Sequence, residues 1–354
     1  MKSPASSTLL VSLPEDVADE AQLDDLLSRP RPPLAEFIRQ VRGPLLILGA
    51  GGKMGPSLAV LACRAAAAAG HKLRVVAVSR FRNAAVREWV ESRGVEAISC
   101  DLFDREAMAR LPEAADILYL VGVKFGTNQN PSLTWAANTI IPTNVAERFP
   151  EARIVALSTG NVYPMVPIAS GGATESDALT PLGEYANSAV ARERLFEFHS
   201  RQRGTRMVFM RLNYALDLRY GVLHDLAQRV WSGEPVDLTN GYFNCIWQGD
   251  ANDCIVRSLG LAASPPLALN LTGPDVLSVR AVAARLAELM GKSVKFTGIE
   301  SGLALLNNPA QACKLLGPPP TPLESAMRWT ANWVMQGGAS LNKPTHFEVG
   351  DGRY

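Results

Sequence analysis

Residues 45–55 read LLILGAGGKMG, a run of four apolar residues that leads directly into three glycines spaced three apart. Residues 56–69 follow as PSLAVLACRAAAAA, so the pattern is a buried strand, a tight turn and a helix. In a dinucleotide-binding turn the first glycine permits the bend, the second lets pyrophosphate approach the backbone, and the third lets the helix pack on the strand. The stretch therefore predicts a dinucleotide site on a Rossmann fold. The loop residues expected to line it are Gly49, Gly51, Gly52, Met54 and Gly55.

The same alternation of short apolar runs and helix-length stretches continues toward the C-terminus. LRVVAVS, VEAIS and DILYLVG have the character of strands, and AAVREWVESRG that of a helix. This order predicts an α/β fold with a parallel, doubly wound sheet. After Asn213 the pattern is less regular, which predicts a smaller, mixed lobe. The expected divisions are an N-terminal extension (1–43), a Rossmann domain (44–212), a substrate lobe that returns in part to the Rossmann domain (213–335) and a C-terminal tail (336–354).

The composition of the 354 residues is that of an ordinary globular protein, with 47% hydrophobic and 19% charged residues. The net charge is +1, and no block of like charges occurs, so neither nucleic acid nor a membrane surface is an expected partner. The five cysteines lack CxxC spacing and the four histidines are isolated, so neither a disulfide framework nor a metal site is expected. The first apolar stretch is too short for a signal sequence, which predicts a cytoplasmic location. A small molecule is the expected partner.

The end of the second strand bears on the choice of dinucleotide. It reads Ser79-Arg80-Phe81-Arg82, where an NAD-specific protein commonly carries an acidic residue for the ribose hydroxyls. Arginines at Arg80 and Arg82 suit a 2′-phosphate, so the sequence favours NADP, with NAD as the alternative. The same arginines would also suit a solvated start of the next helix.

Several ordered motifs between Pro44 and Val334 resemble the extended short-chain dehydrogenase/reductase family, which contains NAD(P)-dependent sugar epimerases, dehydratases and reductases. The glycine loop resembles its GxxGxxG, STGNVYP its SSxxVYG, and RLNYA its RxxNxYG. The resemblance implies contacts with the cofactor after the third and fourth strands, two catalytic hydroxyls, and polar substrate contacts. The implied cofactor residues are Asp101, Leu102, Val121, Gly122 and Lys124, the implied catalytic residues are Thr159 and Tyr185, and the implied substrate residues are Asn161, Tyr163 and Asn213.

The chain departs from that family at the catalytic helix. The family has YxxxK, whereas here Tyr185 is followed four residues later by Ala189. The family's lysine lowers the pKa of the tyrosine and holds the nicotinamide ribose. Three interpretations stay open. Tyr185 acts as a neutral acid or with another cation, Lys124 or Arg192; the chemistry has moved to other residues; or the protein binds the dinucleotide without turnover, as a sensor.

The resemblance implies hydride transfer on a sugar, a sugar acid or a nucleotide sugar. Oxidation, reduction, epimerisation and dehydration remain equally open on the sequence. Many relatives pair through two helices of the Rossmann domain. Because residues 133–149 and the helix after Tyr185 are rich in apolar residues, we expect a homodimer.

Overall fold

A seven-stranded parallel sheet forms the centre of the computed structural model, which describes residues 13–124, 126, 129–343 and 345–348. The strand order is β12-β7-β5-β4-β1-β2-β3. The sequence-based prediction of a parallel, doubly wound sheet is confirmed. The strands are β1 (Leu45–Leu48), β2 (Val75–Ser79), β3 (Glu96–Ser99), β4 (Asp116–Tyr119), β5 (Arg153–Thr159), β7 (Arg206–Leu212) and β12 (Leu267–Leu271).

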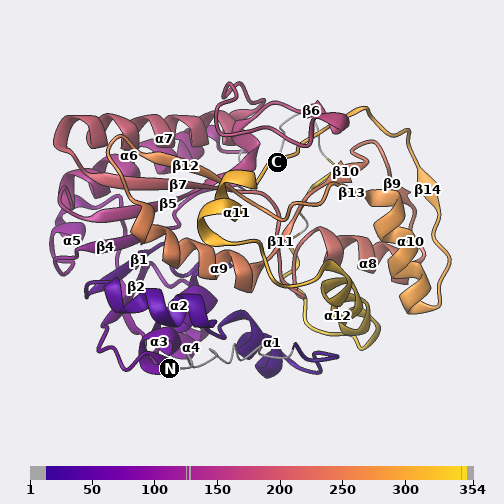
Figure 1. Cartoon of the computed structure of the whole chain (residues 1–354), viewed down its shortest axis with the longest axis horizontal. Helices are drawn as coiled ribbons and strands as arrows, with labels where there is room; N and C mark the ends of the chain where they lie inside the picture. Colours follow the sequence, from indigo (N-terminus) through magenta and orange to yellow (C-terminus); the bar gives the residue numbers. More distant parts are fainter. Residues whose placement is uncertain (1–12, 125, 127–128, 344, 349–354) are drawn as a thin grey trace, which may run out of the picture.

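Helices cover both faces of this sheet because its strands are apolar on both sides. In β1, Leu45 and Ile47 pack with α3 and α9, whereas Leu46 and Leu48 pack with α6 and α7. Figure 1 shows α6 and α7 side by side on one side of the sheet. The helices of these layers are α3 (Gly55–Ala68), α4 (Ala84–Glu91), α5 (Arg105–Ala109), α6 (Pro131–Arg148), α7 (Glu184–Arg203), α9 (Gln248–Arg257) and α11 (Ala310–Leu316).

A second core lies in a lobe beside the sheet, built around three helices that pack on one another. These helices are α8 (Val222–Ser232), α10 (Val279–Met290) and α12 (Leu323–Met335), and Figure 1 shows them grouped away from the seven strands. Short strands accompany them, namely β8 (Ala215–Leu216), β9 (Val236–Asp237), β10 (Tyr242–Phe243), β11 (Ile246–Trp247), β13 (Leu277–Ser278) and β14 (Phe296–Thr297). A separate short pair joins β6 (Val166–Pro167) to β15 (Leu303–Ala304).

The N-terminal extension packs against both cores. Helix α1 (Glu20–Leu27) buries Leu23 and Leu27 in the lobe, and residues from α2 (Pro32–Phe37) onward bury Leu34 and Ile38 against the Rossmann core. Helix α2 ends at Phe37, where a 3₁₀ turn over Ile38–Gln40 follows it. Helix α1 had no distinct signal in the sequence.

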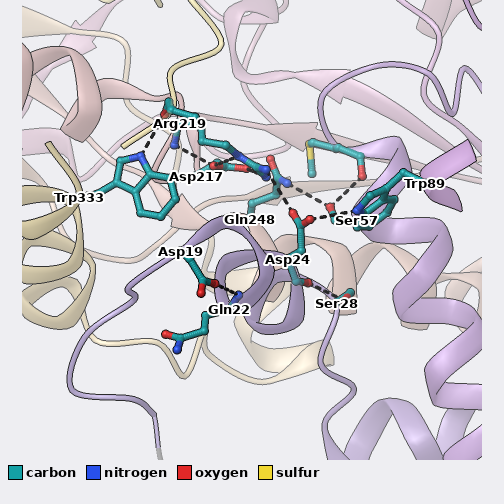
Figure 2. Close-up of polar contacts among 12 residues, drawn as sticks. Asp19, Gln22, Asp24, Ser28, Ser57, Trp89, Asp217, Arg219, Gln248 and Trp333 are labelled. Atoms are coloured by element: carbon teal, nitrogen blue, oxygen red, sulfur yellow. Dashed lines mark hydrogen bonds and ion pairs between the residues drawn. The ribbon is translucent and has the colours of Figure 1, made fainter. Parts of the chain in front are cut away.

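Asp24 of α1 joins the two parts through its carboxylate. It accepts a hydrogen bond from Trp89 Nε1 of α4 at 3.0 Å and one from Arg219 Nη1 of the lobe at 3.1 Å (Figure 2). Arg219 also pairs with Asp217 at 2.9 Å. The extension thus links the outer face of the Rossmann domain to the lobe segment that leads into Tyr220.

Candidate active site

A cavity of about 170 Å³ lies where the carboxyl ends of the parallel strands meet the lobe. This is the edge of an open α/β sheet at which ligands bind. Its walls come from the glycine loop, the ends of β4, β5 and β7, the start of α7, two lobe segments and the C-terminal tail. The lining residues are Lys53, Met54, Lys124, Leu157, Ser158, Thr159, Asn161, Tyr185, Leu212, Asn213, Tyr214, Ala215, Tyr220, Gln248 and Thr345.

The glycine loop has the geometry that a dinucleotide pyrophosphate requires. Gly49 has a φ of 86°, a left-handed conformation that favours glycine. A Cβ on Gly55 would lie 2.4 Å from the Ala50 carbonyl oxygen, so only glycine lets α3 start this close to β1. A Cβ on Gly52 would meet just the Gly49 oxygen, at 3.4 Å, and would otherwise fill the space in front of the helix N-terminus. That is the space a pyrophosphate occupies, so these residues fit the predicted cofactor.

The residues predicted at the adenosine end gather at the ends of β2 and β3. Arg80 Nη1 lies 4.0 Å from Asp101 Oδ2, and Arg82 is exposed. Ser79 abuts Gly51, because a Cβ on that glycine would lie 2.6 Å from the serine oxygen. By contrast, the Leu102 side chain is buried in the core below.

The two predicted catalytic hydroxyls share the cavity. Tyr185 is the second residue of α7, and Thr159 is the last residue of β5. Thr159 Oγ1 accepts the backbone N–H of Asn161 at 3.2 Å and donates to Asn161 Oδ1 at 3.3 Å. This turn fixes the threonine hydroxyl and Asn161 against the end of the strand.

Position 189, where the family has its lysine, lies in the protein interior. Ala189 is completely buried beside Val162, Tyr163 and Ala173. Of the two replacement cations considered from the sequence, the structure brings Lys124 into the cavity with Tyr185 and Thr159.

Arg192 has a different position. Its guanidinium donates to the Val121 carbonyl oxygen at 3.0 Å and to Asn138 Oδ1 at 3.2 Å. A Cβ on Gly122 would lie 2.8 Å from the same guanidinium. Arg192 therefore supports the backbone after β4, where Val121 and Gly122 are predicted to follow the cofactor.

Two of the three predicted substrate residues line the cavity, and the third does not. Asn161 and Asn213 contribute to its wall. The structure instead places Tyr163 in the interior, 2% exposed. The Tyr163 hydroxyl donates to Asn270 Oδ1 at 2.9 Å and accepts from Arg211 Nη1 at 2.6 Å. Tyr163 thus stabilises the core behind the strands rather than facing a substrate in this cavity.

Sequence reasoning did not single out Lys53, Tyr220 or Thr345. The Lys53 ammonium lies 2.9 Å from the centroid of the Tyr220 ring, across the cleft from its own loop. Burial lowers the Lys53 pKa from 10.5 to about 7, and repulsion by Lys124 and Lys343 acts in the same direction. Burial also lowers the pKa of Lys124, to about 8. Of these three residues, only Lys53 had a signal in the sequence, because it lies within the glycine loop.

The C-terminal tail reaches the cavity from the lobe. Thr345 is 1% exposed, and its N–H donates to Asp225 Oδ2 of α8 at 2.8 Å. Phe347, two residues later, is buried in the lobe core. The tail thus forms part of the cavity wall.

Comparison with protein families matches one part of the chain. Residues 45–216 match the model of the NAD dependent epimerase/dehydratase family. This stretch of the chain carries the domain of that family. No curated protein sequence matches it at a significant level. Across the described residues, no helix is long and apolar enough to span a membrane, and no group of three or more His, Cys, Asp or Glu is placed to hold a metal ion.

Solved structures with the same fold include several epimerases. UDP-glucose 4-epimerase from Thermotoga maritima, solved with UDP-glucose, has a TM-score of 0.68 at 17% identity, over 83% of this chain and 99% of that one. The Thermus thermophilus UDP-glucose 4-epimerase complex with NAD gives 0.65 at 21% identity, over 81% and 97%. UDP-glucuronic acid 4-epimerase from Bacillus cereus, with UDP-glucuronic acid and NAD, gives 0.67 at 17% identity, over 82% and 99%. At these identities the likeness concerns the fold alone.

Proposed function

We propose that the protein catalyses NAD(P)-dependent hydride transfer at a hydroxyl-bearing carbon of a sugar or sugar derivative. The observation that carries this proposal is the convergence of Tyr185, Thr159 and Lys124 on one cavity that begins at the glycine loop. The match of residues 45–216 to the epimerase/dehydratase family supports it, as do structural neighbours solved with NAD and UDP-sugars. Oxidation, reduction, epimerisation and dehydration all begin or end with such a transfer.

Each residue has a distinct proposed role. The nicotinamide, when bound, supplies the hydride acceptor or donor. Tyr185 moves the proton at the reacting substrate oxygen, and Thr159 orients that oxygen by a hydrogen bond. Lys124 supplies the positive charge that Ala189 lacks, since a nearby cation favours a phenolate. In this proposal the positive charge comes from the segment after β4, whereas the family's lysine lies on the helix that corresponds to α7.

The cofactor preference is proposed to be NADP. Arg80 and Arg82 both follow β2, where a 2′-phosphate would lie. Arg80 is half-exposed and only 4.0 Å from Asp101, so this weak surface ion pair can be exchanged for a phosphate contact.

A homodimer is proposed through the outer surfaces of α6 and α7. Leu133 and Ile140 of α6 are 47% and 48% exposed, and Phe198 of α7 is 56% exposed. Adjacent exposed apolar side chains on two packed helices are typical of a helix-bundle interface. Light scattering at micromolar concentration tests this, and a monomer would contradict it.

A second candidate function follows from Ala189. Loss of the family's lysine at a buried position also suits a protein that binds the dinucleotide as a sensor without turnover. Tight, specific dinucleotide binding with no turnover of any carbohydrate would favour this candidate.

Substitution of Tyr185 tests the proposed function. Sugars and sugar acids are screened with NAD and NADP by the absorbance of the reduced nicotinamide. With a substrate found, Tyr185→Phe should abolish turnover while leaving cofactor affinity intact, because only the hydroxyl is lost. Tyr242→Phe, which alters a lobe tyrosine outside the cavity, is the matched control. Full activity in Tyr185→Phe would refute the assigned role.

A further inference from the structure

A row of buried asparagines ends at the cavity wall beside Thr159. Asn213, Asn244 and Asn307 are all buried, and they come from three separate segments of the chain. A Cβ on Gly160, the residue after Thr159, would lie 3.0 Å from Asn213 Cβ. Of the three asparagines, only Asn213 lines the cavity. Asn213 is therefore the member of the row that a bound molecule can touch.

Two backbone carbonyl groups fix the direction in which these amides point. Asn244 Nδ2 donates to the Asn307 carbonyl oxygen at 2.6 Å, which leaves Asn244 Oδ1 as the acceptor at the other end of that amide. Asn213 Nδ2 donates to Asn244 Oδ1 at 2.7 Å and to the Leu305 carbonyl oxygen at 3.3 Å. Because a carbonyl oxygen only accepts, turning either amide over would place two acceptors against each other. Both protons of Asn213 Nδ2 are thus used inside the protein.

The oxygen of the Asn213 amide is left to the cavity. No hydrogen bond from the described residues reaches Asn213 Oδ1. The neighbouring Asn307 amide differs, since its Oδ1 and Nδ2 are both unpaired and fully enclosed. Asn213 Oδ1 is not enclosed in this way, so it is open to the cavity that its side chain lines. The wall beside Thr159 therefore presents a neutral hydrogen-bond acceptor.

Asn270 shows how the protein completes the same arrangement elsewhere. Its Nδ2 also donates to two carbonyl oxygens, that of Ala173 at 2.9 Å and that of Asn308 at 3.0 Å. Its Oδ1 accepts from the Tyr163 hydroxyl at 2.9 Å. Asn270 does not line the cavity, and a hydroxyl of the protein pairs with its oxygen. Asn213 makes the same two inward donations, and the partner that its oxygen lacks corresponds to that hydroxyl.

We propose that Asn213 Oδ1 accepts a hydrogen bond from a hydroxyl of the substrate. Asn244 is a positioning residue in this proposal, because it holds the Asn213 amide, together with the Leu305 carbonyl, in the orientation that requires a donor. The inference deepens the proposed function and rests on it for the reacting group at Tyr185 and Thr159.

The fixed oxygen defines what a substrate must offer at this wall. The hydroxyl is a second one, close to the reacting group, because Asn213 and Thr159 both adjoin Gly160. A carboxylate or phosphate oxygen at the same place would meet Asn213 Oδ1 as another acceptor. An analogue without the hydroxyl leaves a desolvated acceptor unpaired, which costs more than the hydrogen bond itself contributes. The substrate class is therefore a compound with at least two hydroxyls close together and no negative charge at this position.

Asn213→Asp tests the orientation of the amide without any ligand. The substitution places an oxygen where Nδ2 now donates, opposite the Leu305 carbonyl and Asn244 Oδ1. This contact raises the pKa of the introduced carboxyl in the folded protein, so its ionisation destabilises the fold. The urea midpoint should fall below that of wild type, and by more at pH 8 than at pH 5. Asn83→Asp, at the exposed N-cap of α4 where only Oδ1 is used, should show no such loss.

Deoxy sugars test the requirement for a donor. D-glucose and D-galactose, each with its 2-, 3-, 4- and 6-deoxy analogues, are titrated by calorimetry into the full chain with NADP present. In wild type, removal of one particular hydroxyl should weaken binding about ten-fold or more. In Asn213→Ala, which lacks the acceptor, that analogue and its parent should bind equally. Asn332→Ala, which changes an asparagine of α12 outside the cavity, should discriminate like wild type.

Two substitutions of Asn244 test its positioning role. Asn244 does not line the cavity, so a change in ligand preference would come through Asn213. In Asn244→Ala the Asn213 amide is free to turn over, and the preference for the parent sugar over the deoxy analogue should disappear. Asn244→Asp keeps an acceptor for Asn213 Nδ2 and should retain the preference. This rescue also guards against misfolding of the alanine variants.

Four results would overturn the inference. The first is an Asn213→Asp variant as stable as wild type at pH 8. The second is equal binding of each parent sugar and all its deoxy analogues by wild type, and the third is no binding of either parent sugar at millimolar concentration. The fourth is loss of NADP affinity alone in Asn213→Ala, which would assign the oxygen to the nicotinamide carboxamide, since that group also carries donor protons.

Hydride transfer measured with the same sugars separates this inference from the proposed function. Asn213-dependent recognition of a hydroxyl without turnover supports the inference and contradicts the proposed function. Tyr185-dependent turnover that Asn213→Ala leaves equally selective for the parent sugars does the reverse.

Discussion

Replacing Lys53 with methionine should stabilise the ligand-free protein at neutral and lower pH. Methionine keeps most of the apolar stem and removes the buried charge. In the folded protein the pKa of Lys53 is about 7, against 10.5 for an unhindered lysine, so charging it costs up to about 5 kcal/mol at 1.36 kcal/mol per pKa unit. Solvation at the cavity mouth and loss of the contact with the Tyr220 ring reduce the net gain to about 1–3 kcal/mol.

The sign of the pH dependence follows from proton linkage. Between pH 7 and 10.5 the unfolded chain holds more protons at Lys53 than the folded chain, so wild-type stability rises with pH across this window. The gain from Lys53→Met should therefore be complete below pH 7 and vanish near pH 10.5. Burial is the main cause of this low pKa; Lys124 and Lys343 lower it further, and Asp225 and Asp217 act to raise it.

Thermal unfolding at several pH values measures this effect. With an unfolding entropy of about 2.1 cal/mol/K per residue, the expected gain corresponds to a Tm increase of about 1–4 °C at pH 6.5. Lys72→Met provides the exposed control and should change Tm little at any pH. A Tm gain that is equal at pH 6.5 and pH 10, or a loss of Tm at pH 6.5, would refute the conclusion that the buried Lys53 ammonium lowers the free energy of unfolding.

Three further substitutions examine other parts of the molecule. Asp24→Ala should lower the free energy of unfolding by about 2 kcal/mol, because it leaves an indole N–H and a guanidinium without their shared acceptor; an unchanged urea midpoint would contradict this. Gly55→Ala should abolish dinucleotide binding or unfold the loop, since its methyl group would overlap backbone, whereas Gly302→Ala, where the added group meets open space, should be neutral in the same calorimetric titration. Arg80→Ala should weaken NADP about ten-fold more than NAD, and equal losses for both dinucleotides would rule out a phosphate contact.

Local patterns predicted the sheet because its strands are short, largely apolar and separated by helix-length segments. LLILG and LRVVAVS are unambiguous for this reason, and the spacing of the glycines after the first strand predicts the turn. Residues that end neighbouring parallel strands meet at one edge. The family resemblance implied Thr159, Asn213 and Lys124 as site residues, and this rule explains why they line one cavity with the glycine loop.

The rest of the site depends on contacts between segments far apart in the chain. Thr345 lies in a tail without periodicity, and only its bonds to Asp225 bring it to the cavity. Tyr163 illustrates the opposite difficulty, because its motif suggests a substrate contact while its hydroxyl is held by Arg211 and Asn270. The pattern of apolar residues along the sequence does not show which distant side chains hydrogen-bond to one another.

The link made by Asp24 also bears on how the two lobes can move. Clefts between domains commonly open by a rigid-body rotation about a few connecting segments, which act as the hinge. Here α1 spans both bodies outside those segments, with Leu23 and Leu27 in one core and Asp24 hydrogen-bonded to Trp89 on the other side. A rotation that separated the lobes at α1 would have to break these bonds or withdraw two buried leucines from the lobe. The N-terminal extension therefore opposes any rotation that would separate the two lobes at α1.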